Sequence, residues 1–205
     1  MSNPDLERAR RYVLARLAAE LPADLPYHGI HHTRDDVLPA AERLATLSQL
    51  GAEELLLVQT AALYHDLGYV ARYIHNEPLG AQIAAETLPR FGYSPTQIKV
   101  IEGMILATQL PQNPNTFLEE LLCDADLDSL GRDDFLETSH NLREELILHR
   151  IELPLKSWYR QQGDFLRAHK YFTPAAQTLR RHQKLENITL LEKLCNAECH
   201  SAPTL

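Results

Sequence analysis

The sequence predicts an all-α protein built as a single-domain helical bundle, and three observations support this fold class. Apolar residues recur at helical spacing along almost the whole chain. No short segment combines β-branched residues with the strict alternation of a half-buried strand. The length of 205 residues suits one full hydrophobic core better than two ordinary domains. We therefore expect one domain over residues 1–205.

Prolines and capping residues indicate where the helices begin and end. Pro39 predicts a kink or break in the second helix. Ser94-Pro95 and Thr173-Pro174 each supply an N-cap followed by a first helical residue. We expect helices at residues 5–20, 31–49, 52–68, 76–92, 95–110, 116–131, 133–151, 154–170 and 174–196.

Composition and charge restrict the class of partner. The net charge of -8 and the isoelectric point near 5.7 disfavour a nucleic-acid polymer. No apolar run approaches the roughly 20 residues that cross a bilayer, and MSNPDLERARRY lacks the apolar stretch of a signal peptide. The three cysteines, Cys123, Cys195 and Cys199, are an odd number, unlike a disulfide framework. We expect a cytoplasmic protein with reduced thiols, and neither a membrane nor a nucleic-acid polymer as partner.

Carboxylates interrupt apolar helices at two places. His65 and Asp66 follow the apolar run ending at Leu63, and Asp124 and Asp126 lie within the apolar segment 121–127. A buried carboxylate needs a cationic or metal partner. Each pattern also has a simpler explanation, a helix end that reaches solvent or a solvated acidic stripe.

A histidine cluster just before the second helix changes the balance between these explanations. YHGIHHTRDD contains His28, His31 and His32. One imidazole from this cluster, the His65-Asp66 pair and one carboxylate from 121–127 make two nitrogen and two oxygen ligands. Such a set suits a first-row divalent ion with positions left open for water and substrate. An ion of this kind lowers the pKa of a bound water and polarises a phosphoryl oxygen.

The ordered set of a histidine, a His-Asp pair and an aspartate on consecutive helices resembles the HD-domain superfamily of metal-dependent phosphohydrolases. The resemblance implies that His32, His65, Asp66 and Asp126 are metal ligands in a core of about 27–131, with the helix 5–20 and the helices of 133–196 packed on it. Ala125-Asp126-Leu127 matches the family's ADxL pattern, and Asp124 is the reserve candidate for the fourth ligand. Asp66 is also counted as catalytic, because its replacement by alanine is expected to abolish both metal binding and turnover.

The spacing of Tyr27, His28 and His32 is similar to the YHxxxH motif of the cyclic-nucleotide phosphodiesterase branch. There the second histidine binds metal and the first donates a proton to the leaving group. The resemblance thus implies that His28 is a general acid, a role that suits a group with a pKa near neutrality. A loop histidine without a role is the alternative for His28, and His31 is expected at the surface or behind the ligands.

His75 lies where many HD proteins have an HxE segment, here completed by Glu77. In some branches this histidine binds a second metal, but those branches carry further histidines where this chain has Ala107, Thr108 and Gln109. We therefore expect one divalent transition metal ion, iron, manganese, zinc, nickel or cobalt. His75 is predicted to be catalytic and to contact the substrate phosphate or the activated water, and a capping or surface histidine is the alternative.

Other positions bear on the substrate. HDLGY places Tyr69 where many HD domains have lysine, which weakens the transfer of any one substrate. The C-terminal third is locally basic, and Arg167 and Lys170 are predicted to bind substrate phosphate. Solvated helix faces are the simpler explanation for most of these basic residues.

These features predict a metal-dependent phosphohydrolase, either a phosphomonoesterase or a phosphodiesterase. The expected substrate is a small phosphate ester, a nucleotide or a nucleotide-like molecule, and a homodimer is left open. The alternatives are a non-haem iron oxygenase on the same helical frame and a non-catalytic sensor or binding module that retains metal.

Overall fold

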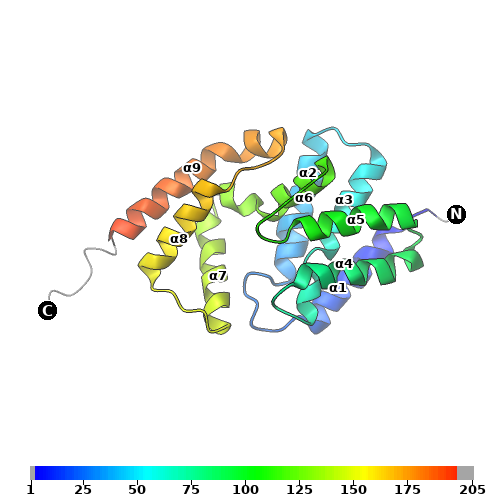
Figure 1. Ribbon diagram of the computed structural model, residues 1–205, viewed down its shortest axis with the longest axis horizontal. Helices are drawn as coiled ribbons and strands as arrows, with labels where there is room; N and C mark the ends of the chain where they lie inside the picture. Colours follow the sequence, from blue (N-terminus) through cyan, green and yellow to red (C-terminus); the bar gives the residue numbers. More distant parts are fainter. Residues whose placement is uncertain (1–2, 198–205) are drawn as a thin grey trace. The chain divides into compact units, whose positions relative to one another are not determined.

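The structure, a computed structural model, describes residues 3–197, and every regular element in that range is helical (Figure 1). This confirms the predicted all-α fold class. The chain forms two compact units, Met1–Leu127 and Asp128–Leu205. The expectation that they belong to one domain stays a prediction, and Cys199 lies outside the described residues.

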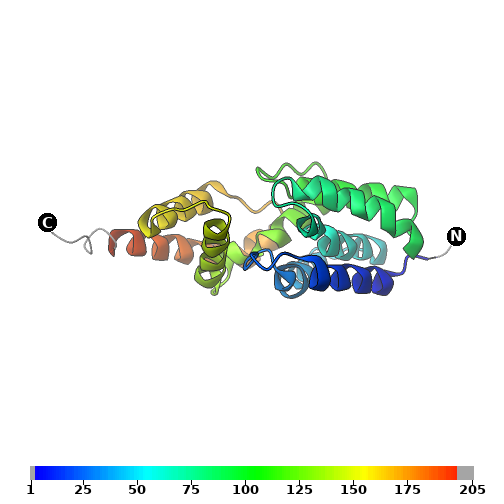
Figure 2. The same ribbon diagram turned by 90° about the horizontal axis from the view of Figure 1, so that it is seen from below.

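The first unit is built around one buried helix. Its elements are α1 (Leu6–Glu20), a π-helical turn (His32–Val37), α2 (Leu38–Leu47), α3 (Ala52–Tyr64), a 3-10 turn (Leu67–Val70), α4 (Asn76–Thr87), a 3-10 turn (Leu88–Phe91), α5 (Pro95–Ala107) and α6 (Phe117–Asp126). Helix α3 contacts α1, α2, α4, α5 and α6. Figure 2 shows it, in cyan, between the dark-blue α1 and the green α4 and α5. Its apolar run therefore forms the centre of the core, as its sequence predicts.

Several predicted helices end earlier than expected, and the differences fall beside the candidate ligands. The predicted helix 31–49 is α-helical at His31, passes through a π-helical turn over His32–Val37 and returns to α geometry at Leu38, just before Pro39. A proline cannot donate to the preceding turn, which explains the change of hydrogen-bond pattern there. The predicted helices 52–68 and 116–131 leave α geometry after Tyr64 and Asp126 and continue as 3-10 turns.

Glycine allows α4 to lie directly on the turn that follows α3. A Cβ atom at Gly68 would lie 1.9 Å from the backbone oxygen of Asn76, and one at Gly80 would lie 2.9 Å from that of Tyr64. A side chain at position 68 would force the turn and the start of α4 apart. The close approach places the first residues of α4 beside the turn that carries Asp66.

The second unit contains a 3-10 turn (Asp128–Gly131), α7 (Phe135–Leu148), α8 (Leu155–Ala168) and α9 (Pro174–Ala197). The Arg180 guanidinium donates two hydrogen bonds of 2.7 Å to Asp128, which joins α9 to the turn. Trp158, which is 1% exposed, donates to the Ser139 hydroxyl and joins α8 to α7. Across residues 3–197, no helix has both the length and the apolar character that a membrane span requires.

Candidate metal centre

The first unit brings together the four side chains predicted as metal ligands. His32 lies in the π-helical turn, His65 and Asp66 directly follow α3, and Asp126 is the last residue of α6. His32 Nε2 lies 3.6 Å from Asp66 Oδ2 and 3.3 Å from Asp126 Oδ1. His65 Nε2 lies 3.2 Å and 3.6 Å from the same two oxygens. Four donor atoms from three distant parts of the chain thus converge.

Two of these donor atoms face each other at 3.2 Å but form no hydrogen bond of good geometry. His65 and Asp66 are 1% and 8% exposed, and His65 Nε2 and Asp66 Oδ2 are buried without a hydrogen-bond partner. A native structure rarely leaves buried polar atoms in this state unless another group satisfies them. His32, 4% exposed, completes with them a group of three donors that could hold a metal ion.

The spacing of the donors suits a first-row divalent ion. Ligand bonds of about 2.0–2.2 Å in tetrahedral arrangement place neighbouring donor atoms about 3.3–3.6 Å apart. The four nitrogen-to-oxygen distances run from 3.2 to 3.6 Å. Two imidazoles and two carboxylates are also the mixed set that iron, manganese, zinc, nickel and cobalt accept. The residues therefore fit such an ion.

The backbone orients His65 toward the cluster. His65 Nδ1 lies 2.8 Å from the carbonyl oxygen of Ala62, so Nδ1 carries the proton and donates to that oxygen. Nε2 is then the nitrogen available to a metal ion. This contact comes from the last turn of α3 itself.

Without a bound cation, the cluster holds a proton. Burial alone lowers the pKa of His65, but the carboxylates of Asp66 and Asp126 raise it to about 9. Burial alone raises the pKa of the Asp66 carboxyl, but His65, with His28 and His32, holds it well below its usual range. The metal-free pair is therefore an imidazolium next to a carboxylate, and a metal ion has to displace the proton.

His28 lies at the edge of the cluster among aromatic rings. Its ring stacks on Tyr69 with centroids 4.5 Å apart and an interplanar angle of 24°. It meets Tyr27 edge-on at 4.7 Å and His32 edge-on at 5.8 Å. Tyr69, at the position where many HD domains have lysine, thus supports one face of the predicted general acid.

His75 occupies a strained position at the start of α4. Its φ of 56° is left-handed, a conformation that costs a non-glycine residue free energy and is often found at functional sites. The Gln109 side-chain amide lies 3.3 Å from His75 Nδ1, so donation by that amide leaves Nε2 of the exposed ring carrying the proton. Nearby, Glu77 has a buried carboxylate oxygen, Oε2, without a hydrogen bond.

The two basic residues predicted to bind phosphate belong to the second unit. Arg167 donates to Asp164 at 2.9 Å and to Glu192 at 2.7 Å, so its guanidinium already has anionic partners. Lys170 is exposed between α8 and α9. Their role as substrate ligands stays a prediction.

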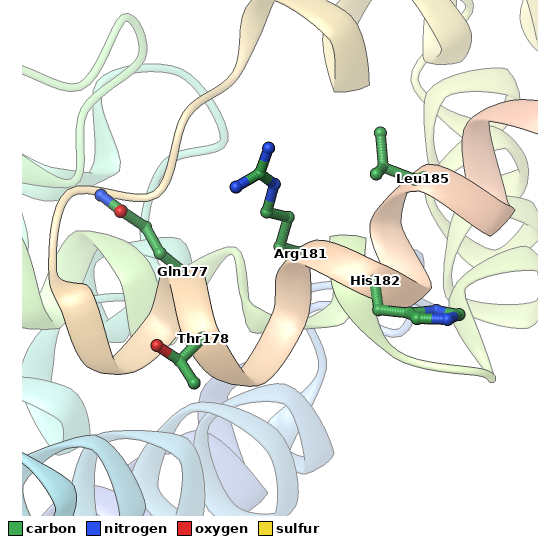
Figure 3. A pocket seen from close by; sticks show the side chains of 5 residues that line it. All are labelled: Gln177, Thr178, Arg181, His182 and Leu185. Carbon is green, nitrogen blue, oxygen red and sulfur yellow. The ribbon is translucent and has the colours of Figure 1, made fainter.

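A hollow of about 460 Å³ on α9 also carries basic groups (Figure 3). Figure 3 shows the side chains of Gln177 and Arg181 projecting from one side of the helix and that of Thr178 from another, with His182 directed away from all three. Because its polar groups do not converge on a point, this hollow lacks the arrangement of a catalytic site.

Sequence reasoning missed the residues that support the site. The stacking of Tyr69 on His28 had one signal, the aromatic residue in HDLGY, which marked a departure from the family pattern but not a contact. The bond between Gln109 and His75 joins residues 34 positions apart and has no sequence signal. Both contacts depend on the tertiary structure, because the turn after α3 places Tyr69 on His28 and the turn after α5 places Gln109 beside His75.

The chain shares its fold with a protein of known structure. No family model and no curated protein matches it. It is similar to the crystal structure of a predicted HD superfamily hydrolase from an uncultured Thermotogales bacterium, at 17% identity. The match covers 91% of both chains with a TM-score of 0.64. The predicted resemblance is therefore confirmed for the fold.

Proposed function

We propose that the protein is a metal-dependent phosphohydrolase that acts on a small phosphate ester, a nucleotide or a nucleotide-like molecule. The observation that carries the proposal is the convergence of His32, His65, Asp66 and Asp126 at separations of 3.2 to 3.6 Å. The name of the structural neighbour, a predicted HD superfamily hydrolase, supports hydrolysis as the reaction type.

The four side chains would hold one divalent ion. When bound, such an ion supplies Lewis-acid polarisation of a phosphoryl oxygen and a lowered pKa for water. Asp66 and Asp126 contribute two negative charges, and His32 and His65 contribute neutral nitrogens once His65 has lost its proton. A coordination position that the four side chains leave free would admit the phosphate group.

Two further histidines are proposed to serve the reaction. His28, held between Tyr69 and the ring of Tyr27, would donate a proton to the leaving oxygen of the ester. His75 would donate a hydrogen bond from Nε2 to the substrate phosphate, because Gln109 occupies Nδ1. Both rings are fixed by neighbours, which reduces the entropy lost when the substrate binds.

Replacing one ligand tests the proposal. Asp66→Asn keeps the size of the side chain but removes its charge, so the purified variant should lose its metal and at least about a thousandfold in kcat/KM. The measurement is elemental analysis of protein purified without chelator, followed by hydrolysis of a panel of phosphate esters. The matched control is Asp133→Asn, at an exposed position in the second unit. This variant should retain both the metal ion and the hydrolytic activity.

Two results would contradict this function. Full hydrolytic activity in Asp66→Asn would remove the cluster from the mechanism. Two irons per chain together with oxygen consumption would replace hydrolysis by the oxygenase alternative.

A further inference from the structure

A cavity of about 580 Å³ lies between the end of α5 and the first half of α6. Figure 1 shows these two helices joined by the loop that crosses this end of the unit. The side chains that matter for its chemistry are Leu106, Gln109, Leu110, Asn113, Asn115 and Glu119. A volume of this size suits a small organic molecule.

Two contacts connect the cavity to the candidate metal centre. Gln109 lines it and also hydrogen-bonds His75. Ala107 lines it too, and its carbonyl oxygen accepts from the Cys123 thiol at 3.2 Å. Cys123 precedes Asp126 by three residues on α6, which is about one helical turn, or roughly 5 Å. Through these two contacts the lining of the cavity is connected to His75 and to the helix that ends at Asp126.

The charge of the cavity is negative. Among the described residues that line it, Glu119 is the one charged side chain, and there is no lysine, arginine or histidine. The Asn115 backbone N–H donates to Glu119 Oε2 at 2.6 Å, and the other oxygen lies where a Cβ atom at Gly103 would approach to 3.1 Å. Gly103 thus leaves space beside the carboxylate. A second anionic group placed here would be repelled and would find no cationic partner.

The remaining surface is partly apolar. Leu106 is 45% exposed and Leu110 is 59% exposed, although both are large apolar side chains. They line the cavity together with Asn113 and Asn115, a combination of apolar area and a few polar groups that is typical of ligand pockets.

We infer that this cavity binds the alcohol part of the phosphate ester and selects alcohols that are neutral or positively charged. The inference rests on the proposed phosphohydrolase function. In that function the phosphate group lies at the metal cluster, and the alcohol part of the ester extends past His75 and Gln109 into the cavity. Substrates whose alcohol carries another phosphate or a carboxylate are rejected by Glu119. The site therefore acts on esters with a single phosphate group.

The test compares alkyl phosphates of increasing chain length that end in an ammonium, a hydroxyl or a carboxylate group. In the metal-loaded wild type, kcat/KM should rise with chain length for the first two series and remain low for the carboxylates. Glu119→Gln removes the negative charge of the cavity. The ratio of kcat/KM for ammonium esters to kcat/KM for carboxylate esters should then fall about fivefold. The matched control is Glu120→Gln, the same change at a residue that does not line the cavity. This variant should leave the ratio of the two kcat/KM values unchanged.

A second variant fills the cavity. A Cβ atom at Gly103 would meet only the flexible end of the Glu119 side chain, and leucine favours a helix more than glycine does, so Gly103→Leu should retain the fold. The variant should raise KM for long esters about tenfold and leave the shortest ester and the metal content unchanged.

The outcomes separate the two proposals. Hydrolysis with no dependence on terminal charge, unchanged in Glu119→Gln and Gly103→Leu, would overturn the inference and leave the phosphohydrolase intact. A metal-loaded protein that hydrolyses no ester in any series would overturn the proposed function and the inference with it.

Discussion

The two aspartates of α6 can be distinguished at the scale of single residues, because the helix turns about 200° between them. Asp126 directs Oδ1 to His32 and His65 at 3.3 and 3.6 Å, whereas Asp124, two residues earlier on the helix, is 0% exposed. Asp126→Asn should therefore lose metal affinity at least about a hundredfold, with less than about 1 kcal/mol lost from the metal-free free energy of unfolding. Asp124→Asn should keep the metal and cost about 1–3 kcal/mol of stability.

Metal titration and denaturation of both variants check this prediction. A variant Asp124→Asn that loses the metal while Asp126→Asn keeps it would transfer the fourth ligand to Asp124. Loss of metal in both would show that the end of α6 has to be intact as a whole.

The proton held by His65 gives metal binding a definite pH dependence. The pKa of His65 is about 9 without a cation, so below that pH a metal ion has to displace the proton. The apparent metal affinity should rise with pH, at most about tenfold per pH unit, and level off above about pH 9. Calorimetry in buffers of different ionisation enthalpy should show close to one proton released per ion at pH 7, and binding without proton release would contradict the ion pair.

The candidate ligands could be selected from the sequence because the anomaly at their carboxylates is local, and their role as ligands stays a prediction. A carboxylate within an apolar run, such as Asp66 or Asp126, can be recognised from its neighbours in the sequence alone. The supporting contacts could not be predicted, because Tyr69 and Gln109 belong to ordinary turn and helix-end sequences. Their roles depend on which distant ring the folded chain places beside them.

At the scale of elements, the closest approach in the first unit is that of α4 on the turn after α3. Gly68→Ala would place a Cβ atom 1.9 Å from the Asn76 oxygen, and backbone atoms cannot move aside cheaply. The variant should lose about 2–4 kcal/mol of stability, because the turn has to separate from α4. Metal affinity should fall with it, since the same turn carries Asp66.

The control for this variant is Gly51→Ala. Its Cβ atom would meet only the Glu54 side chain at 3.6 Å, so the free energy of unfolding should fall only by the cost of alanine at this N-cap, about 1 kcal/mol or less. Thermal denaturation monitored by circular dichroism compares the two. Equal stability of both variants would mean that the turn and α4 can separate without cost.

The helices could be predicted from periodicity and caps, and their ends could not. Ser94 caps α5 and Pro174 opens α9 as expected, since capping is a local hydrogen-bond effect. The 3-10 turns after Tyr64 and Asp126 follow instead from packing, which directs the side chains at these ends toward one another. No pattern of neighbours along the chain specifies that geometry.

At the scale of the whole molecule, the chain offers one probe for each unit. All four candidate ligands lie in Met1–Leu127, and the sole tryptophan, Trp158, lies in Asp128–Leu205. Trp158 is buried and bonded to Ser139, so its fluorescence reports unfolding of the second unit. Metal binding therefore reports on the first unit, and tryptophan fluorescence reports on the second unit of the same chain.

The prediction of a single domain requires that these two probes respond together. A divalent ion at a hundredfold excess over its Kd stabilises the state that binds it by about 2.7 kcal/mol. For a chain of this length, that gain should raise the melting temperature by about 5–10 °C. If residues 1–205 unfold as one domain, the Trp158 transition shifts by this full amount, although the ion binds only to the first unit. In Asp66→Asn the same ion should cause no shift. A Trp158 transition that stays fixed in the wild type while the helical signal moves would show that the chain consists of two independently unfolding domains.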